Sequence, residues 1–184
     1  MNAGIVASRY AKSLLKYVQE NGAGEKVYSQ ACTLVAYMAE LHQLRLIIED
    51  SSEVSLDKKI GLLTSALKTD LEPSLFKFLE LLSQNRRINL FSRILLAFIE
   101  QYRSVNNIKV GLLVTAVQID GLRERLEGIF AEKMSSEVHL EEKIDSDIIG
   151  GFIFELDGFR LDASVEGQLE RLRAQLVEKN NRIV

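Results

Sequence analysis

The sequence predicts a mainly α protein with a smaller α/β part: an N-terminal six-helix bundle followed by a small α/β domain with a short sheet and a C-terminal helix. Apolar residues make up 47% of the 184 residues, enough for a well-buried core. Proline occurs once, and long apolar-periodic runs with few turn residues favour helices. After Asn107 the apolar spacing changes from helical to alternating. We therefore place two domains, at residues 1–106 and 107–184.

Five or six helices are expected in the first domain, because apolar residues recur there at helical spacing. The first ends at Asn21 and Gly22, a pair typical of helix C-termini. Ser55 is suited to cap the fourth helix, and Pro73 to open the fifth. Between the third and fourth helices, residues 51–53 break the pattern. The first, second, third, fifth and sixth helices are expected at residues 5–20, 25–41, 44–49, 73–82 and 89–105.

The second domain is expected to contain strands and helices, because apolar residues occur there at both alternating and helical spacing. Alternating apolar residues predict a strand over residues 109–116, and a second strand is expected over residues 138–144. Asp120 is suited to cap the helix between them. The apolar residues of that helix recur at helical spacing: Leu122, Leu126, Ile129 and Phe130.

A β-hairpin is predicted near the end of the chain. Asp157 and Gly158 separate two apolar runs, at residues 152–156 and 159–161. An Asp-Gly pair between apolar runs is a strong hairpin signal, because both residues tolerate the positive φ that a tight hairpin turn requires. The register set by this turn places alternate residues of the first run on one face of the sheet.

Two glycines precede the hairpin, and a helix follows it. Gly150 and Gly151 do not form a phosphate cradle, since a β-rich run follows them instead of a helix with free amide donors. We interpret them as a close approach of two backbone segments or a bulge at a strand start. The closing helix has one apolar face that we expect to pack on the sheet: Val165, Leu169, Leu172 and Leu176.

Two helices carry more apolar surface than one packed face needs. Apolar residues of the first helix fill an arc of roughly 180°, and those of the helix opened by Pro73 fill roughly 220°, against about 100° for a single packed face. One interpretation is that both helices lie centrally and are covered on two sides by their own chain. The other is that part of each arc forms an open groove for a helix of a partner protein.

Residues that carry catalytic chemistry are missing. The sequence has neither a G-x-x-x-x-G-K-[ST] phosphate loop nor a G-x-G-x-x-G motif. His42, His139 and the single cysteine, Cys32, are too few for a zinc site. Acidic residues between positions 141 and 147 are interpreted as a solvated edge, with a weak divalent cation site as the alternative. We predict no catalytic, cofactor-binding or metal-binding residue, and therefore no enzyme.

Charge and hydropathy exclude two further classes of partner. A net charge of -3 without a clustered basic face argues against nucleic-acid binding. No apolar run approaches the roughly 18 residues needed to span a bilayer, and the N-terminus lacks the features of a signal peptide. We expect a protein that is made and kept in the cytoplasm and is not inserted into a membrane.

Motifs along nearly the whole chain resemble one family. Residues 8–14 are similar to the R-Y-A-x-A-L opening of the F-type ATP synthase delta subunit, called the oligomycin-sensitivity-conferring protein (OSCP) in mitochondria. Residues 78–88 are similar to the end of that family's fifth helix, which usually runs into N-G-R-L. The C-terminal order of strand, two glycines, strand, D-x-S and L-x-x-L completes the resemblance.

Two positions depart from the family pattern. Arg86 stands where the family usually has glycine, so we expect Asn85 to take the left-handed conformation that ends the helix. Ala163 occupies a position often held by glycine in the turn before the last helix. Neither residue carries chemistry, so neither changes the assignment.

The resemblance implies a non-catalytic stator subunit of the proton-translocating ATP synthase. Such a subunit links the catalytic head to the peripheral stalk, so that rotation is coupled to ATP synthesis. The resemblance also implies one copy per complex, on the cytoplasmic side of the inner (plasma) membrane, without a cofactor. A free-standing helical scaffolding or regulatory module that binds other proteins is the alternative.

The same resemblance implies two partner sites. In the family, a groove between the first and fifth helices binds the N-terminal segment of an alpha subunit, and the C-terminal domain receives the C-terminal ends of the b subunits. By motif position, the groove contacts are Tyr10, Ser13, Leu14, Phe78 and Leu81. The turn and cap residues of the C-terminal domain are Gly150, Gly151, Asp157, Gly158, Asp162 and Ser164.

Overall fold

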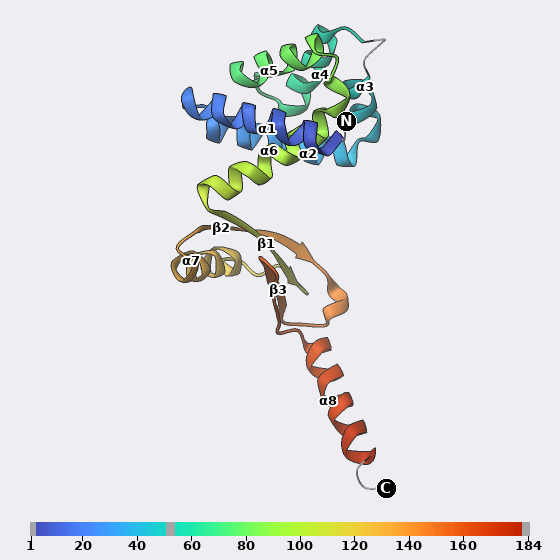
Figure 1. The fold of residues 1–184 in the computed structure, drawn as a ribbon. Helices are drawn as coiled ribbons and strands as arrows, with labels where there is room; N and C mark the ends of the chain where they lie inside the picture. Colours follow the sequence, from blue (N-terminus) through green and yellow to red (C-terminus); the bar gives the residue numbers. More distant parts are fainter. Residues whose placement is uncertain (1–2, 51–53, 182–184) are drawn as a thin grey trace. The chain divides into compact units, whose positions relative to one another are not determined.

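The computed structural model describes residues 3–50 and 54–181, with side chains as far as residue 174. The chain consists of two compact units, Met1–Asn106 and Asn107–Val184 (Figure 1). None of the described helices combines the length and the apolar character that crossing a membrane requires.

The N-terminal unit is helical, and its helices follow the segments expected from apolar spacing, with ends that differ by a few residues. The break expected at residues 51–53 lies outside the described residues. The described elements are α1 (Ala3–Glu20), α2 (Gly24–Glu40), α3 (His42–Glu49), α4 (Leu56–Leu67), α5 (Pro73–Gln84), the short 3-10 helix η1 (Ile88–Leu90) and α6 (Phe91–Asn106).

Helix α6 lies at the centre of this unit, because it packs along both α1 and α2. Phe91, Ile94, Leu95 and Phe98 recur at helical spacing on one face of α6 and are fully buried. Helix α1 packs mainly against α6, and its contact with α5 is much smaller. Part of the apolar surface of α1 and α5 is therefore left uncovered where the two helices meet.

The end of α5 differs from the expectation. Asn85 has a φ of -82°, whereas Arg86 takes the left-handed conformation with a φ of 55°. The N–H of Arg87 donates to the carbonyl oxygen of Leu82 at 2.8 Å, which is the bond that closes a Schellman motif. Our assignment to Asn85 was wrong because the hydrogen-bond pattern requires positive φ one residue beyond the cap, whichever side chain stands there.

The expected helix caps are only partly present. Gly22 ends α1 with a φ of 64°, as its sequence context predicts. Ser55 occupies the N-cap position of α4, but its side chain makes no capping hydrogen bond. The prediction that Asp120 caps the helix of the second unit was wrong. That helix begins after Gly121, whose φ of 74° makes the turn without a side-chain cap.

The C-terminal unit contains a four-stranded sheet in the order β2-β1-β3-β4. Strand β1 pairs in parallel with β2 and antiparallel with β3, and β3 and β4 form an antiparallel hairpin. The parallel pair is joined through a helix, as such a crossover requires. The elements are β1 (Ile108–Thr115), α7 (Leu122–Met134), β2 (Glu137–Ile144), the 3-10 helix η2 (Ser146–Ile148), β3 (Phe152–Leu156), β4 (Phe159–Asp162) and α8 (Val165–Asn181).

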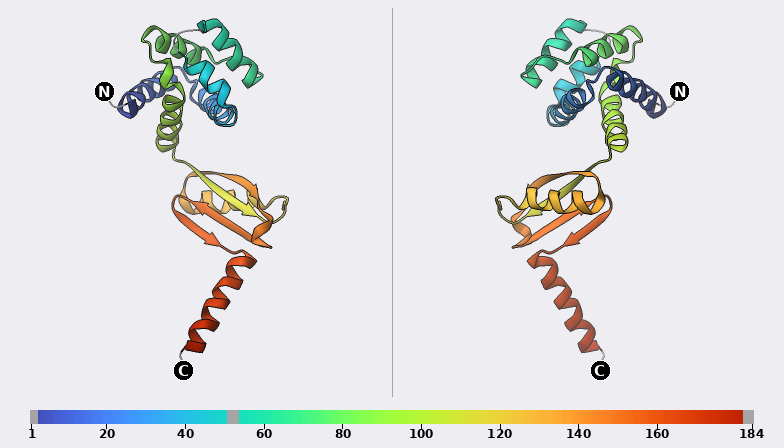
Figure 2. Two further views of the ribbon diagram at one scale, coloured as in Figure 1. Left: turned by 90° about the vertical axis from the view of Figure 1, so that its right-hand side faces the viewer. Right: turned by 90° about the vertical axis from the view of Figure 1, so that its left-hand side faces the viewer.

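Helix α7 covers one face of this sheet (Figure 2). Phe130 of α7 stacks on Phe154 of β3 with ring centroids 4.1 Å apart. Leu113, Leu140 and Leu156 complete the buried layer beneath the helix. Ile129, which we placed with the apolar residues of this helix, is 43% exposed and lies outside this core. The core is therefore small and is made mostly by one face of the sheet.

The expectation that the apolar face of α8 packs on the sheet was wrong. Val165, Leu169 and Leu172 are 39%, 44% and 55% exposed. The fourth residue of that face, Leu176, lies beyond the described side chains. Helix α7 already covers the face of the sheet that carries the buried apolar side chains of β3. Helix α8 instead packs by its first turns against η2 and extends away from the sheet (Figure 1).

A single residue connects the two units. Helix α6 ends at Asn106 and β1 begins at Ile108, so Asn107 alone joins them. Asn107 has a φ of 53°, and its side-chain amide donates to the carbonyl oxygen of Ser135 at 2.9 Å. The connection is therefore short and is held by the C-terminal unit.

Candidate functional site

An apolar groove of about 370 Å³ lies between α1 and α5. One wall comes from α1 and the other from α5, the two helices whose apolar arcs exceed one packed face. Its lining residues are Ser13, Leu14, Tyr17, Lys77, Phe78 and Leu81.

The floor of the groove belongs to the core of the N-terminal unit. Leu14 is 1% exposed and Phe78 is 5% exposed, so each presents only a small part of its side chain to the groove. The ring of Tyr10 meets Phe78 edge to face, with centroids 6.4 Å apart and an interplanar angle of 71°. Because edge-to-face pairs are favourable, Tyr10 supports the floor from α1 without lining the groove itself.

The rim of the groove is more open than its floor. Leu81 is 43% exposed, Tyr17 is half-buried and Ser13 is exposed. The hydroxyl of Ser13 donates to the carbonyl oxygen of Arg9 at 3.1 Å, so this hydroxyl is already engaged with its own helix. The exposed part of the groove therefore offers mainly hydrocarbon and aromatic surface, which suits an apolar side chain of another protein.

The structure brings the five predicted groove residues together across the α1–α5 junction. Four of them line the groove, and Tyr10 supports it through Phe78. Sequence reasoning missed Tyr17 and Lys77 as lining residues. Tyr17 was visible within the apolar arc of the first helix, one turn after Ser13. Lys77 stands one turn before Leu81, but nothing in the apolar pattern marks a lysine as part of a groove wall.

A second cluster of predicted residues directs α8 away from the hairpin. The hydroxyl of Ser164 donates to Asp162 Oδ1 at 2.6 Å, and its oxygen accepts the N–H of Gly167 at 3.0 Å. The Ser164 hydroxyl and then its backbone N–H lower the pKa of Asp162 below the usual range. The guanidinium of Arg171 also donates to the carbonyl oxygen of Asp162 at 2.7 Å. The start of α8 is therefore hydrogen-bonded to the end of β4.

Gly150 and Gly151 allow two backbone segments to lie close together where β3 and α8 begin. Gly151 has a φ of 76°, and a Cβ atom there would overlap the carbonyl oxygen of Ala163. At Gly150, a Cβ would lie 3.2 Å from a methyl group of Val165. The two glycines thus allow the start of β3 to pass close against the first residues of α8.

The hairpin turn uses two residues with positive φ. Asp157 and Gly158 have φ values of 52° and 83°, as expected for the tight turn of an Asp-Gly hairpin. The carboxylate of Asp157 accepts a hydrogen bond from Lys109 Nζ at 2.6 Å. This pair links the turn to β1, so the hairpin is held at its tip as well as along its strands.

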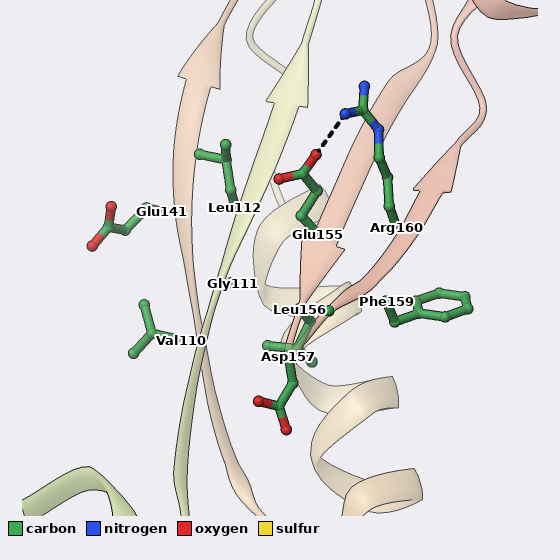
Figure 3. Close-up of a pocket in the computed structure, with 10 residues that line it drawn as sticks. Val110, Gly111, Leu112, Glu141, Glu155, Leu156, Asp157, Phe159 and Arg160 are labelled. Atoms are coloured by element: carbon green, nitrogen blue, oxygen red, sulfur yellow. Dashed lines mark ion pairs between the residues drawn. The ribbon is translucent and has the colours of Figure 1, made fainter. Parts of the chain in front are cut away.

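The face of the sheet opposite α7 carries a shallow pocket of about 590 Å³ beside the hairpin (Figure 3). Its floor includes Val110 and Leu112 of β1, and on β3 and β4 Glu155 pairs with Arg160 at 3.0 Å. Figure 3 shows Glu141 pointing away from this ion pair. The described residues contain no group of three or more His, Cys, Asp or Glu residues that could hold a metal ion. This pocket therefore combines aliphatic surface with an internally paired charge.

The sequence as a whole matches one family. A sequence model described as ATP synthase delta (OSCP) subunit matches residues 6–176. Similar proteins named ATP synthase subunit delta include those of Bacteroides fragilis, 34% identical over 192 aligned positions, and Bacteroides thetaiotaomicron, 35% identical over 187. Both alignments cover 100% of each chain. The protein of that name from Trichormus variabilis is 32% identical and covers 93% of each chain.

A solved structure shares the fold. A chain of the mitochondrial ATP synthase hexamer of Toxoplasma gondii matches with a TM-score of 0.61 at 23% sequence identity. The match covers 93% of this chain and 97% of that one. The arrangement of a helical unit followed by a small α/β unit is thus found in that chain too.

Proposed function

The chain belongs to the ATP synthase delta (OSCP) subunit family, and we propose that it joins the catalytic head of the enzyme to the peripheral stalk through one surface on each unit. As a member of this family it is a non-catalytic stator subunit of an F-type ATP synthase, a membrane-associated complex. It acts on the cytoplasmic side of the membrane, with one copy in each complex. No observation favours the alternative of a free-standing scaffolding module.

The groove between α1 and α5 is the proposed site for the head. Its occupant is an amphipathic helix from the N-terminal segment of an alpha subunit, with apolar side chains seated over Leu14, Phe78 and Leu81. Grooves of this kind bind the apolar face of a helix, and a few buried anchors supply most of the affinity. The observation that carries this proposal is the apolar groove itself, formed by two helices whose apolar arcs their own chain does not cover.

The exposed face of α8 is the proposed site for the stalk. Val165, Leu169 and Leu172 form an apolar stripe that this chain leaves open to solvent. The hydrogen bonds of Asp162 and Ser164 set the direction in which α8 leaves the hairpin. The C-terminal ends of the b subunits then pack against this stripe, because helices with matching apolar stripes pair readily in water.

The proposed mechanism is mechanical and uses no bound cofactor. Rotation of the central rotor exerts torque on the catalytic head, and the stator must hold the head still against the membrane sector. A protein can transmit such a force through two docking surfaces on folded units, since packed cores deform little. The described residues of both sites offer packing surfaces and hydrogen-bonded caps rather than a reactive group.

Leu81→Asp tests the groove in the full-length chain. Under a bound helix the new carboxylate is buried without a partner, so binding of a peptide from the N-terminal segment of the alpha subunit is expected to weaken by at least ~2 kcal/mol. Leu96→Asp is the matched control, because Leu96 lies on α6, is 48% exposed and does not line the groove. Calorimetry on folded variants that gives equal affinity for Leu81→Asp and wild type rejects the groove.

A further inference from the structure

Basic side chains border the groove on both sides. Lys77 of α5 lines the groove and is exposed. On α1, Arg9 and Lys16 lie four residues before and three residues after Ser13, and both are exposed. Residues at these spacings share one side of a helix with Ser13. The α1 rim therefore presents two cations about two helical turns apart, and the α5 rim presents a third.

These rim charges have little compensation from their own chain. Among the ion pairs of the described residues, none involves Arg9 or Lys77, and Lys16 pairs with Glu20 only at 3.8 Å and at high exposure. Together α1 and α5 carry four basic and two acidic side chains, the acidic ones being Glu20 and Glu80. The whole chain has a net charge of -3. The groove is thus a locally positive region of a negatively charged protein.

We propose that the groove selects an amphipathic helix whose apolar face is bordered by carboxylates on both sides. This inference rests on the proposed function and narrows it to one chemical class of partner. Two carboxylates seven residues apart on one border would span about 10.5 Å, the separation of residues seven apart along α1, and would meet Arg9 and Lys16. A carboxylate on the other border would meet Lys77.

The charges and the apolar floor have separate roles. Burial of apolar anchors over Leu14 and Phe78 supplies affinity whatever the charge of the helix. Rim charges pair at the solvent boundary, where each contact contributes little and is screened by salt. Complementary rim charges also speed association and fix the orientation of the bound helix. Selection by charge is therefore modest in energy and strongly dependent on ionic strength.

Three designed peptides test the inference against the full-length chain. They share one apolar face of 20 residues and carry Glu, Gln or Lys at the border positions. At low salt the Glu peptide is expected to bind about tenfold more tightly than the Gln peptide, and the Lys peptide more weakly than both, since three weak pairs add to roughly 1.4 kcal/mol. In 0.5 M salt the three affinities should converge.

Charge reversal on the protein gives the matching variants. The double variant Arg9→Glu and Lys77→Glu should reverse the order, so that the Lys peptide binds more tightly than the Glu peptide. Lys58→Glu is the control, because Lys58 is exposed on α4 and does not line the groove. It reverses one charge outside the groove, half of the total change of charge in the double variant, and should leave the order intact. Circular dichroism confirms that each variant is folded before binding is measured.

The outcomes separate this inference from the proposed function. Equal affinities of the three peptides, all abolished by Leu81→Asp, would overturn the charge selection and leave the groove as the docking site. No binding by any peptide, together with no binding of the alpha-subunit segment, would overturn both. Charge selection that persists unchanged in the Arg9→Glu and Lys77→Glu variant would place the selecting charges elsewhere and overturn the inference alone.

Discussion

In the proposed function both units present an apolar surface to a partner, and they do so in different ways. The N-terminal unit has a large core centred on α6, and its proposed docking surface is a narrow groove whose floor is nearly buried. The C-terminal unit has a small core under α7 and displays the apolar stripe of α8 openly. A groove restricts what can bind by shape, whereas an open stripe depends on the direction in which its helix is held. The first unit therefore relies on packing, and the second on hydrogen bonds and close backbone contacts.

Removing the C-terminal unit gives the largest expected effect. A chain that ends at Asn107 should retain a folded N-terminal unit that binds the head, because the core around α6 lies entirely within residues 1–106. The truncated chain should no longer bind the peripheral stalk. Membranes that contain this chain should therefore hydrolyse ATP without pumping protons. Proton pumping is followed with a pH-sensitive dye, alongside ATP hydrolysis. Normal ATP-driven pumping with this chain as the only copy would contradict the assignment of the C-terminal unit.

Phe154→Ala tests how little core supports the second unit. Phe154 is fully buried and stacks on Phe130, so its truncation should cost about 3–5 kcal/mol. A unit of this size has a marginal reserve of stability, and we expect it to unfold while the N-terminal unit remains native. Phe159→Ala on the same hairpin is the control, because Phe159 is 52% exposed.

The tyrosines make this measurement selective. All five lie at or before position 102, so tyrosine fluorescence reports on the N-terminal unit alone. Amide hydrogen exchange reports on both units. Loss of exchange protection in β1 and β3 with an unchanged tyrosine signal is the expected result. Simultaneous loss of both signals would show that the two units unfold together. The C-terminal unit would then not be separately less stable than the N-terminal unit.

Gly151→Ala tests the close backbone contact that precedes α8. The added methyl group would overlap the carbonyl oxygen of Ala163, at a positive φ that alanine disfavours, so a loss of at least ~1 kcal/mol is expected. Gly128→Ala is the matched control. A Cβ at Gly128 meets nothing within 4 Å inside α7, and alanine favours helices, so a gain of about 0.5–1 kcal/mol is expected. Thermal denaturation in which both variants shift in the same direction would contradict this account of Gly151.

Arg86→Gly should have the smallest effect, and it is stabilising. Arg86 holds a φ of 55° at the end of α5, where a side chain costs about 1–2 kcal/mol relative to glycine. Part of that gain is offset by the greater freedom of glycine in the unfolded chain, which leaves about 1 kcal/mol. Urea denaturation followed by tyrosine fluorescence measures it. Destabilisation by Arg86→Gly would show that the arginine side chain makes a compensating contribution.

Local patterns in the sequence determine most helices and the hairpin, because spacing and turn chemistry act over a few residues. The apolar period located α1 and α6, and Asp157 with Gly158 located the turn between β3 and β4. Features that depend on contacts between distant parts of the chain could not be predicted in this way. The exposure of Leu169 on α8 follows from long-range packing, in which α7 covers the apolar face of the sheet and α8 contacts η2. Similarly, the residue that takes the left-handed conformation after α5 depends on which backbone N–H donates to the carbonyl oxygen of Leu82.

For the groove, too, some features follow from local sequence patterns and others only from the packing of the whole unit. The apolar arcs of the first and fifth helices are wider than one packed face needs. This width alone does not distinguish a helix that its own chain covers on two sides from a helix with one side open to a partner. The larger contact of α1 with α6 than with α5 decides this point, and it is a property of the assembled unit. Lys77 could not be assigned to the groove from sequence, since its place in the wall follows from how α5 is rotated about its axis.

The one-residue connection at Asn107 has a consequence for how tightly the subunit is retained. If both units bind as proposed, a link of this length limits how far the second unit can move once the first is bound. Short tethers of this kind give effective concentrations on the order of millimolar, and the combined attachment exceeds either single affinity by about 10²–10⁴. Each of the two contacts can then be individually weak and reversible while the subunit stays in place through many rotations. Lengthening this one connection would dilute the advantage without altering a single contact.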